Sequence, residues 1–366
     1  MKNYLNLLLG LVIIVALYSC EKDEDELNIG DNGVSEKIDQ KFFKQLKYAN
    51  DKSNEVWKGY DYSTFPKYFI YRETEDSKAL RGYLVDPATT VNNSNKVPDS
   101  DNMGLNVYRY DNAIHDANKK LLTGNKVYDF DFKIDNKNYY IQSFNTNEIN
   151  RIGTSAIELG FHEVFHYYQY GWKSIEGAIQ DEENYPINNQ LLALQLMTLE
   201  ISKKMPAEKS ISNIEKYLSM YIAIRSKEIE VDPSSKKLVK NMANSQEVSE
   251  GTAKYVDYTL SKDLFENFDK TYEVMSLGDI TSKKEVRSYF AWGIWYSTGA
   301  AVVYMLKQKG VNVEEGVKNG KTLYQLASET MNLTNSQKES FLNLARTEFE
   351  YSTTIINETN RLLSLN

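Results

Sequence analysis

The 366-residue sequence contains little cysteine, histidine or proline: one cysteine, three histidines and six prolines. A single cysteine excludes an internal disulfide framework and any cysteine-rich metal site. The formal net charge of −8 argues against a nucleic-acid partner, because such proteins need a basic surface that displaces counterions from phosphates. The hydrophobic fraction of 41% and the charged fraction of 26% are those of an ordinary globular protein.

Long apolar runs are also scarce, and the one that stands out lies near the start of the chain. Lys2 precedes an apolar segment at 7–17, which is too short to span a hydrocarbon core of about 30 Å and is typical of a signal peptide. The segment ends in Leu17-Tyr18-Ser19-Cys20, which resembles the lipobox of bacterial lipoproteins. The resemblance implies a signal peptide at 1–19 and a lipid on Cys20 that attaches the protein to a membrane, with no transmembrane helix in the mature chain. The alternative is an ordinary signal peptide with an incidental cysteine.

An acidic stretch, Glu-Lys-Asp-Glu-Asp-Glu, occupies residues 21–26. A charge run of this kind is typical of a solvated segment, and we expect a tether at 20–34. A lysine followed by acidic residues directly after the lipid cysteine also resembles the surface-export signal of Bacteroidetes lipoproteins. That resemblance implies an outer-membrane lipoprotein exposed at the cell surface, with a periplasm-facing protein as the alternative.

The sequence pattern changes from strand-like to helix-like near residue 154. Residues 35–49 predict a short helix, and a turn at 135–138 predicts a hairpin. A polar stretch at 87–104 predicts a long loop. Aromatic and β-branched runs predict strands at 68–72, 81–85, 105–109, 126–134 and 139–144.

The second half shows apolar residues at spacings of three and four, which predict helices, including 191–201, 214–224 and 300–306. No linker separates the two patterns. We therefore expect an α+β protein with one continuous domain at 35–366, in which a strand-rich lobe at 35–153 packs on a helical lobe at 154–366.

Two of the three histidines lie four residues apart in His162-Glu163-Val164-Phe165-His166, an H-E-x-x-H motif. Ser155 and Glu158 ahead of it predict a capping box, and Gly171 behind it predicts a helix C-cap. Residues i and i+4 share one helix face, so both imidazoles can bind one metal ion. Glu163 then lies close enough to reach a metal-bound water without being a ligand.

A helical zinc site of this kind needs a third protein ligand. No histidine follows His166, so a carboxylate is the remaining choice. The best candidate lies in 249–257, Ser-Glu-Gly-Thr-Ala-Lys-Tyr-Val-Asp, where Gly251 would allow two helices to approach closely.

The H-E-x-x-H motif followed by Glu250-Gly-Thr-Ala-Lys-Tyr255 resembles the gluzincin zinc metallopeptidases, in which a helix similar to E-G-x-A-x-Y carries the third ligand. The resemblance covers roughly residues 155–304 and implies a zincin-like fold with one zinc ion bound by His162, His166 and Glu250. It implies Glu163 as the general base that takes a proton from the zinc-bound water and passes it to the leaving amine. A peptide or protein is then the substrate, with endopeptidase and aminopeptidase activity both open.

Several positions around this motif leave alternatives. The gluzincin E-x-x-x-D pair is absent because Lys254 follows Glu250 by four residues. Asp257 could instead orient a ligand histidine, or be a solvated carboxylate. Glu247 is an alternative third ligand. Gln169, three residues after His166, could hydrogen-bond to a ligand or be a surface residue.

A peptidase also needs a donor for the developing oxyanion, and tyrosine is the natural candidate here. Tyr296 is the first choice and Tyr289 the second, with a packing role as the alternative for both. We expect His115 to be an exposed residue without a catalytic role. The resemblance also places the strand at 139–144 at a sheet edge beside the substrate, with an interior strand as the alternative.

Two other functions remain open. The first is a catalytically weak or inactive zincin-like lipoprotein that binds peptides or glycans at the cell surface, although the intact Glu163 favours catalysis. The second is a helical glycan-binding lipoprotein without metal, which predicts an exposed aromatic platform and no role for the histidine pair.

Overall fold

The computed structural model describes residues 36–74, 76–124, 126–151, 156–265, 268 and 271–365. The predicted signal peptide, lipidation site Cys20 and acidic tether lie outside the described residues, as does Ser155. The chain divides into two compact units, with the boundary after Val164, inside helix α5 (Ala156–Gln169). The prediction of a mixed α+β class is confirmed, because a six-stranded sheet accompanies a largely helical chain.

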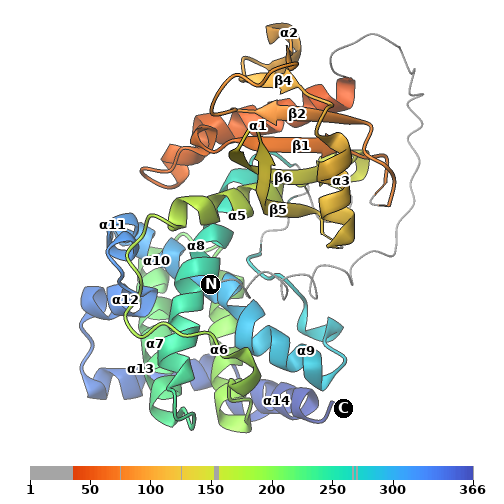
Figure 1. The fold of residues 1–366 in the computed structure, drawn as a ribbon. Coiled ribbons are helices and arrows are strands. Elements are labelled where there is room, and N and C mark those ends of the chain that lie inside the picture. Colours follow the sequence, from red (N-terminus) through yellow and green to blue (C-terminus); the bar gives the residue numbers. More distant parts are fainter. Residues whose placement is uncertain are drawn as a thin grey trace. The chain divides into compact units, whose positions relative to one another are not determined.

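The first unit contains the sheet, in the order β3-β4-β2-β1-β6-β5 (Figure 1). Strands β1 and β6 pair in parallel. On their other sides, β1 pairs antiparallel with β2 and β6 pairs antiparallel with β5. Asp135 and Asn136 connect β5 to β6 with φ of 48° and 61°, the conformation that a two-residue hairpin turn requires. The strands are β1 (Lys67–Tyr71), β2 (Arg81–Val85), β3 (Asn95–Lys96), β4 (Val107–Arg109), β5 (Tyr128–Ile134) and β6 (Lys137–Phe144).

Three features of this unit differ from the predictions. Strand β6 lies between β1 and β5, so the expectation of a sheet edge at 139–144 is wrong, and β5 forms that edge. The predicted loop at 87–104 contains β3 and helix α2 (Asp99–Asn102). Helix α3 (Ile114–Thr123) was not predicted, because it buries only two apolar side chains, Ala117 and Leu121, and its periodic signal is short.

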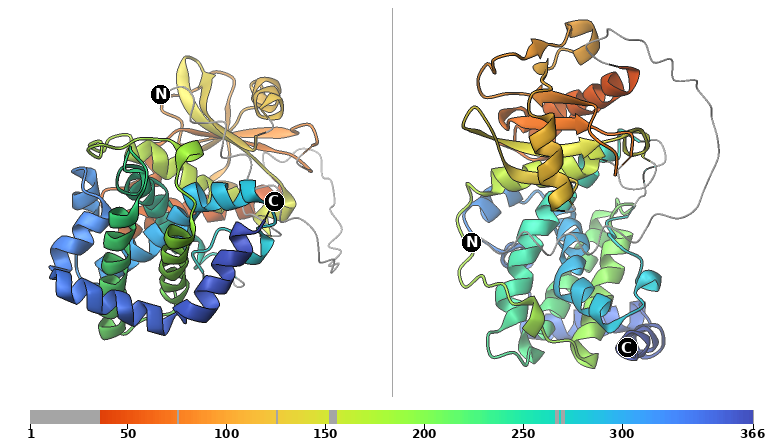
Figure 2. Two further views of the ribbon diagram at one scale, coloured as in Figure 1. Left: turned by 90° about the horizontal axis from the view of Figure 1, so that it is seen from below. Right: turned by 45° about the vertical axis from the view of Figure 1, so that its right-hand side comes forward.

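Helices α1 (Lys37–Val56) and α3 cover opposite faces of this sheet (Figure 2). Successive strand side chains point to opposite faces, so neighbours on β1 meet different helices. The Phe42 ring on α1 contacts Phe69 edge-on at 4.9 Å between centroids. Tyr68 and Ile70, the residues on either side of Phe69, join one core cluster with Leu121 of α3. The central strands β1 and β2 are thus buried at every position, whereas β3 at one end of the sheet is exposed.

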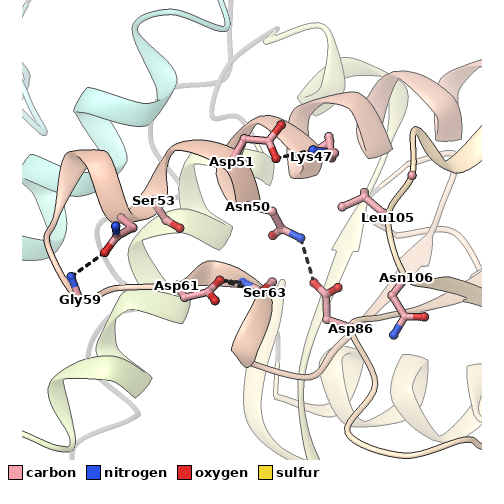
Figure 3. A pocket seen from close by; sticks show the side chains of 12 residues that line it. Lys47, Asn50, Asp51, Ser53, Gly59, Asp61, Ser63, Asp86, Leu105 and Asn106 are labelled. Carbon is pink, nitrogen blue, oxygen red and sulfur yellow. Dashed lines mark hydrogen bonds and ion pairs between the residues drawn. The ribbon is translucent and has the colours of Figure 1, made fainter.

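A polar pocket of about 620 Å³ lies beside α1 and the loop before β1 (Figure 3). Asp86, one of its lining residues, lies 3.0 Å from the buried Lys67 ammonium group, which also donates to the carbonyls of Tyr62 and Phe65. Burial lowers the pKa of Lys67, and the Asp86 carboxylate opposes that effect. Asn50 also donates to Asp86, at 3.4 Å. The pocket is lined by Lys47, Asn50, Asp51, Ser53, Asn54, Gly59, Asp61, Ser63, Asp86, Gly104, Leu105 and Asn106.

The second unit is a helical bundle in which α6, α7, α8 and α10 pack on one another (Figure 2). Three of these helices, α6, α7 and α10, contain the predicted helical segments 191–201, 214–224 and 300–306. Within the described residues, no helix has both the length and the hydropathy that crossing a membrane requires. The helices are α6 (Asn189–Lys204), α7 (Ile211–Val231), α8 (Asn244–Ser261), α9 (Lys283–Ser288), α10 (Ile294–Gln308), α11 (Val313–Lys318), α12 (Leu323–Met331), α13 (Asn335–Glu348) and α14 (Ile356–Leu363).

Helices α8 and α10 approach each other through a pair of glycines. A Cβ atom on Gly251 would lie 2.4 Å from the Gly299 Cα, and one on Gly299 would lie 2.5 Å from the Glu247 carbonyl oxygen. The obstructing atoms are backbone, so no side-chain movement could relieve the overlap. The prediction that Gly251 permits close helix packing is confirmed, and Gly299 is its partner.

Gly251→Ala is expected to destabilise the protein by about 1–3 kcal/mol, because the two helices must separate to admit the methyl group. This cost exceeds the gain of about 1 kcal/mol that alanine normally brings to a helix interior. Urea unfolding of the metal-free protein measures the effect. Gly171→Ala is the control, because its Cβ would lie 3.6 Å from the nearest atom. Equal stability of the two variants would contradict the packing argument.

Candidate metal centre

Helix α5 carries the H-E-x-x-H motif within one continuous helical segment. His162 and Glu163 are buried, with 5% and 1% of their surface exposed, and the His166 side chain is 14% exposed. The spacing of four residues places both imidazoles on one face of the helix. The helix ends two residues before Gly171, whose φ lies outside the left-handed region, so the predicted glycine C-cap is wrong. The turn closes instead through the Trp172 amide, which donates to the Gln169 carbonyl at 2.9 Å.

The structure brings His162, His166 and Glu250 together as a group that could hold a metal ion. One ligand atom from each residue lies within 4.8 Å of the others. The His166 Nε2 and Glu250 Oε2 atoms are 3.5 Å apart. Glu250 lies on α8 and is 5% exposed. Two imidazoles and one carboxylate are a donor set that could hold a metal ion, and the same set of protein donors occurs in catalytic zinc sites.

Gln169 links His166 to the helix that carries Glu250. Its Oε1 lies 2.7 Å from the His166 Nδ1. Its Nε2 donates to the Ser249 carbonyl and to the Thr252 hydroxyl, both at 2.8 Å. The structure therefore favours the prediction that Gln169 contacts a ligand histidine over a surface role.

Glu247, the alternative third ligand, belongs to a buried charge network instead. Its Oε1 accepts from Arg225 Nη2 at 2.6 Å and from the Thr298 hydroxyl at 2.7 Å. Its Oε2 accepts from the Tyr221 hydroxyl at 2.6 Å. Both Glu247 oxygens are thus occupied by hydrogen bonds, and Glu247 lies one helical turn before Glu250. The structure therefore favours Glu250 as the ligand.

Glu247→Gln is expected to destabilise the protein by about 3 kcal/mol, the lower end of the range for breaking a buried ion pair. The loss stays at that end because Arg225 retains its hydrogen bond to Glu228 at 2.6 Å. Urea unfolding in the presence of a chelator measures the change. Glu329→Gln serves as the control, since Glu329 is 57% exposed in a surface pair with Lys321 and such pairs contribute below about 1 kcal/mol. Similar losses in both variants would contradict the buried network.

The same network predicts a pH dependence of stability. Burial raises the pKa of Glu228 to about 7, while Arg225 opposes this shift and the nearby Glu247 adds to it. The folded state therefore holds a proton that the unfolded chain releases near its usual pKa of about 4.3. The contribution of Glu228 to stability is full below that value and is lost as pH rises toward 7. As pH rises from about 4.3 to 7, the unfolding free energy of the wild type should fall relative to that of Glu228→Gln. A constant difference between the two unfolding free energies would contradict the raised pKa of Glu228.

Asp257 forms an ion pair with Lys254 on its own helix, at 3.2 Å, and is buried. A solvated carboxylate is therefore the wrong description. The orientation of a ligand histidine by Asp257 stays a prediction.

The two tyrosine candidates differ in their surroundings. Tyr296 on α10 is half-buried, and its hydroxyl accepts a hydrogen bond from Trp292 at 3.4 Å. Tyr289 is completely buried, and burial, followed by the charge of Glu273, raises its pKa. This contrast favours Tyr296 over Tyr289 as a group that meets a substrate, and its role stays a prediction. His115 is exposed on α3, as expected.

The network of Arg225, Tyr221 and Thr298 around Glu247 was not predicted from the sequence. No local signal marks these residues, because they come from α7 and α10 and meet α8 only in the folded chain. None of the three π-helical turns among the described residues was predicted, and two of them, Val239–Ala243 and Tyr289–Gly293, lead directly into α8 and α10. Such turns are frequent at functional sites.

Comparisons with known proteins gave no match for this chain. No protein-family model matches the sequence, no curated protein matches it, and no solved structure matches the fold. Function is therefore inferred from the chemistry of the residues that meet at α5 and α8.

Proposed function

We propose that this protein is a zinc-dependent peptidase of the gluzincin type with a zincin-like fold. The observation that carries the proposal is the grouping of His162, His166 and Glu250, with ligand atoms within 4.8 Å of one another. Glu163 follows the first of these ligands on the same helix. A nearby base beside an open metal position is the arrangement that metal-assisted hydrolysis requires.

The residues present fit a single zinc ion. His162, His166 and Glu250 would hold it, since nitrogen and oxygen donors of these types are common zinc ligands. A bound zinc ion would polarise the scissile carbonyl and lower the pKa of a water molecule to about 7.

The remaining steps belong to the side chains of the chain itself. Glu163 accepts a proton from the attacking water and donates it to the leaving amine, so that an amide bond breaks and a carboxyl group forms. Its burial keeps bulk water away from the transferred proton. We assign the phenol of Tyr296 to donate a hydrogen bond to the developing oxyanion.

The purified wild-type protein tests the proposal directly. We expect about one zinc ion per chain by elemental analysis and cleavage of an unstructured protein such as casein. A chelator should abolish cleavage, and added zinc should restore it. A protein without zinc would overturn the proposal. Bound zinc without cleavage of casein or of a random peptide library would replace it with a catalytically inactive binding function.

We also propose that the protein is an outer-membrane lipoprotein exposed at the cell surface. This proposal rests on the sequence around Cys20 and on the acidic stretch that follows it. Metabolic labelling with a radioactive fatty acid should mark the wild type and not Cys20→Ala. Protease treatment of intact cells should degrade the labelled protein, whereas protection would indicate the periplasm-facing alternative.

A further inference from the structure

The orientation of the Gln169 amide follows from its neighbours on α8. The Ser249 carbonyl can only accept a hydrogen bond, so the amide nitrogen of Gln169 must face it, at 2.8 Å. The Thr252 hydroxyl donates its proton to the Val248 carbonyl at 2.7 Å, so it too accepts from Gln169. Both contacts require the same orientation, with the Gln169 Oε1 directed at His166.

This orientation determines where the His166 ring carries its proton. The Gln169 Oε1 is an acceptor, so the His166 Nδ1, 2.7 Å away, must be the donor. A neutral imidazole protonated at Nδ1 leaves the lone pair on Nε2. That nitrogen faces the Glu250 Oε2 at 3.5 Å, so two electron-rich atoms converge where a cation would bind.

We propose that Gln169 is a positioning residue that selects the Nδ1–H tautomer of His166 and, through Ser249 and Thr252, holds α5 in register with the α8 segment that carries Glu250. The inference deepens the proposed zinc site and rests on it for its biological role. The tautomer itself is a property of the metal-free protein. Gln169 forms hydrogen bonds with Ser249 and Thr252, which lie on either side of Glu250. One side chain therefore couples the protonation of His166 to the position of Glu250.

The tautomer can be read by long-range 1H–15N NMR of the metal-free protein, in which only three histidines give signals. In the neutral ring of His166, the proposal requires the unprotonated nitrogen to be Nε2. In Gln169→Ala we expect the Nε2–H form to appear and the zinc dissociation constant to rise about 10–100-fold. An Nε2–H tautomer in the wild type, or an unchanged tautomer in Gln169→Ala, would overturn the inference.

Two further variants separate the two roles of Gln169. Gln169→Glu retains an acceptor for the His166 Nδ1–H but cannot donate to Ser249 and Thr252. It should keep the wild-type tautomer and still bind zinc more weakly, and wild-type zinc affinity would overturn the coupling to α8. Gln308→Ala removes an exposed glutamine at the end of α10 and should leave both readouts unchanged. A wild type that shows the Nδ1–H tautomer but binds no zinc would overturn the proposed function and leave the tautomer assignment standing.

Discussion

Glu163→Gln should lower peptide cleavage by about 10²–10⁴-fold while zinc remains bound in full. The substitution keeps the shape of the side chain and replaces the carboxylate, which can accept the proton of the attacking water, with an amide that cannot. Because His162, His166 and Glu250 are unchanged, the metal affinity should be retained. The rate of casein cleavage and the zinc content of the same sample measure the two quantities together.

The matched control for this variant lies on the same helix. Glu158 precedes Glu163 on α5 and pairs with Arg151 at 3.2 Å, with both side chains 17% exposed. Glu158→Gln should change cleavage by less than about twofold, because a partly exposed ion pair contributes little to the fold or to catalysis. If Glu163→Gln cleaves casein as fast as this control, Glu163 is not the general base.

Glu250→Gln is expected to act on the metal itself. An amide oxygen is a poorer zinc ligand than a carboxylate, and the site would lose the one negative charge among its three donors. We expect the zinc dissociation constant to rise by about 100-fold or more, given that residues that only support a ligand already change it about 10–100-fold. Competition with a chromophoric chelator measures the affinity. Cleavage should fall at low zinc and recover in part when zinc is added.

Glu247→Gln provides the contrast on the same helix, one turn before Glu250. The Glu247 oxygens bond to Arg225, Tyr221 and Thr298, so its substitution should lower stability and leave the metal affinity of the folded protein within a few-fold. Glu250→Gln should instead lower the metal affinity and leave the stability of the metal-free protein nearly unchanged. Loss of zinc affinity in Glu247→Gln alone would mean that Glu247, rather than Glu250, is the third ligand.

Local sequence patterns were sufficient for most of the elements that build the sheet. All five residues of β1 are buried, because helices cover the sheet on both faces there. The turn at Asp135 and Asn136 was predicted from residues that tolerate positive φ. The strand at 139–144 was predicted, and so was its hairpin partner β5, but the sheet edge expected there is wrong because β1 pairs with its other side. Its sequence cannot show whether a further strand pairs with it, because backbone hydrogen bonds to either side are independent of side-chain identity.

The histidine pair and Glu163 could be identified from the chain alone, because a helix with a period of about 3.6 residues brings positions i and i+4 together without help from the rest of the protein. The choice between Glu247 and Glu250 could not be made in this way, since both lie on one helix and both are buried. Arg225 from α7 and Thr298 from α10 engage Glu247, and Gln169 bonds to α8 on both sides of Glu250. These contacts join residues distant in sequence, and they exist only after Gly251 and Gly299 have allowed α8 and α10 to pack closely.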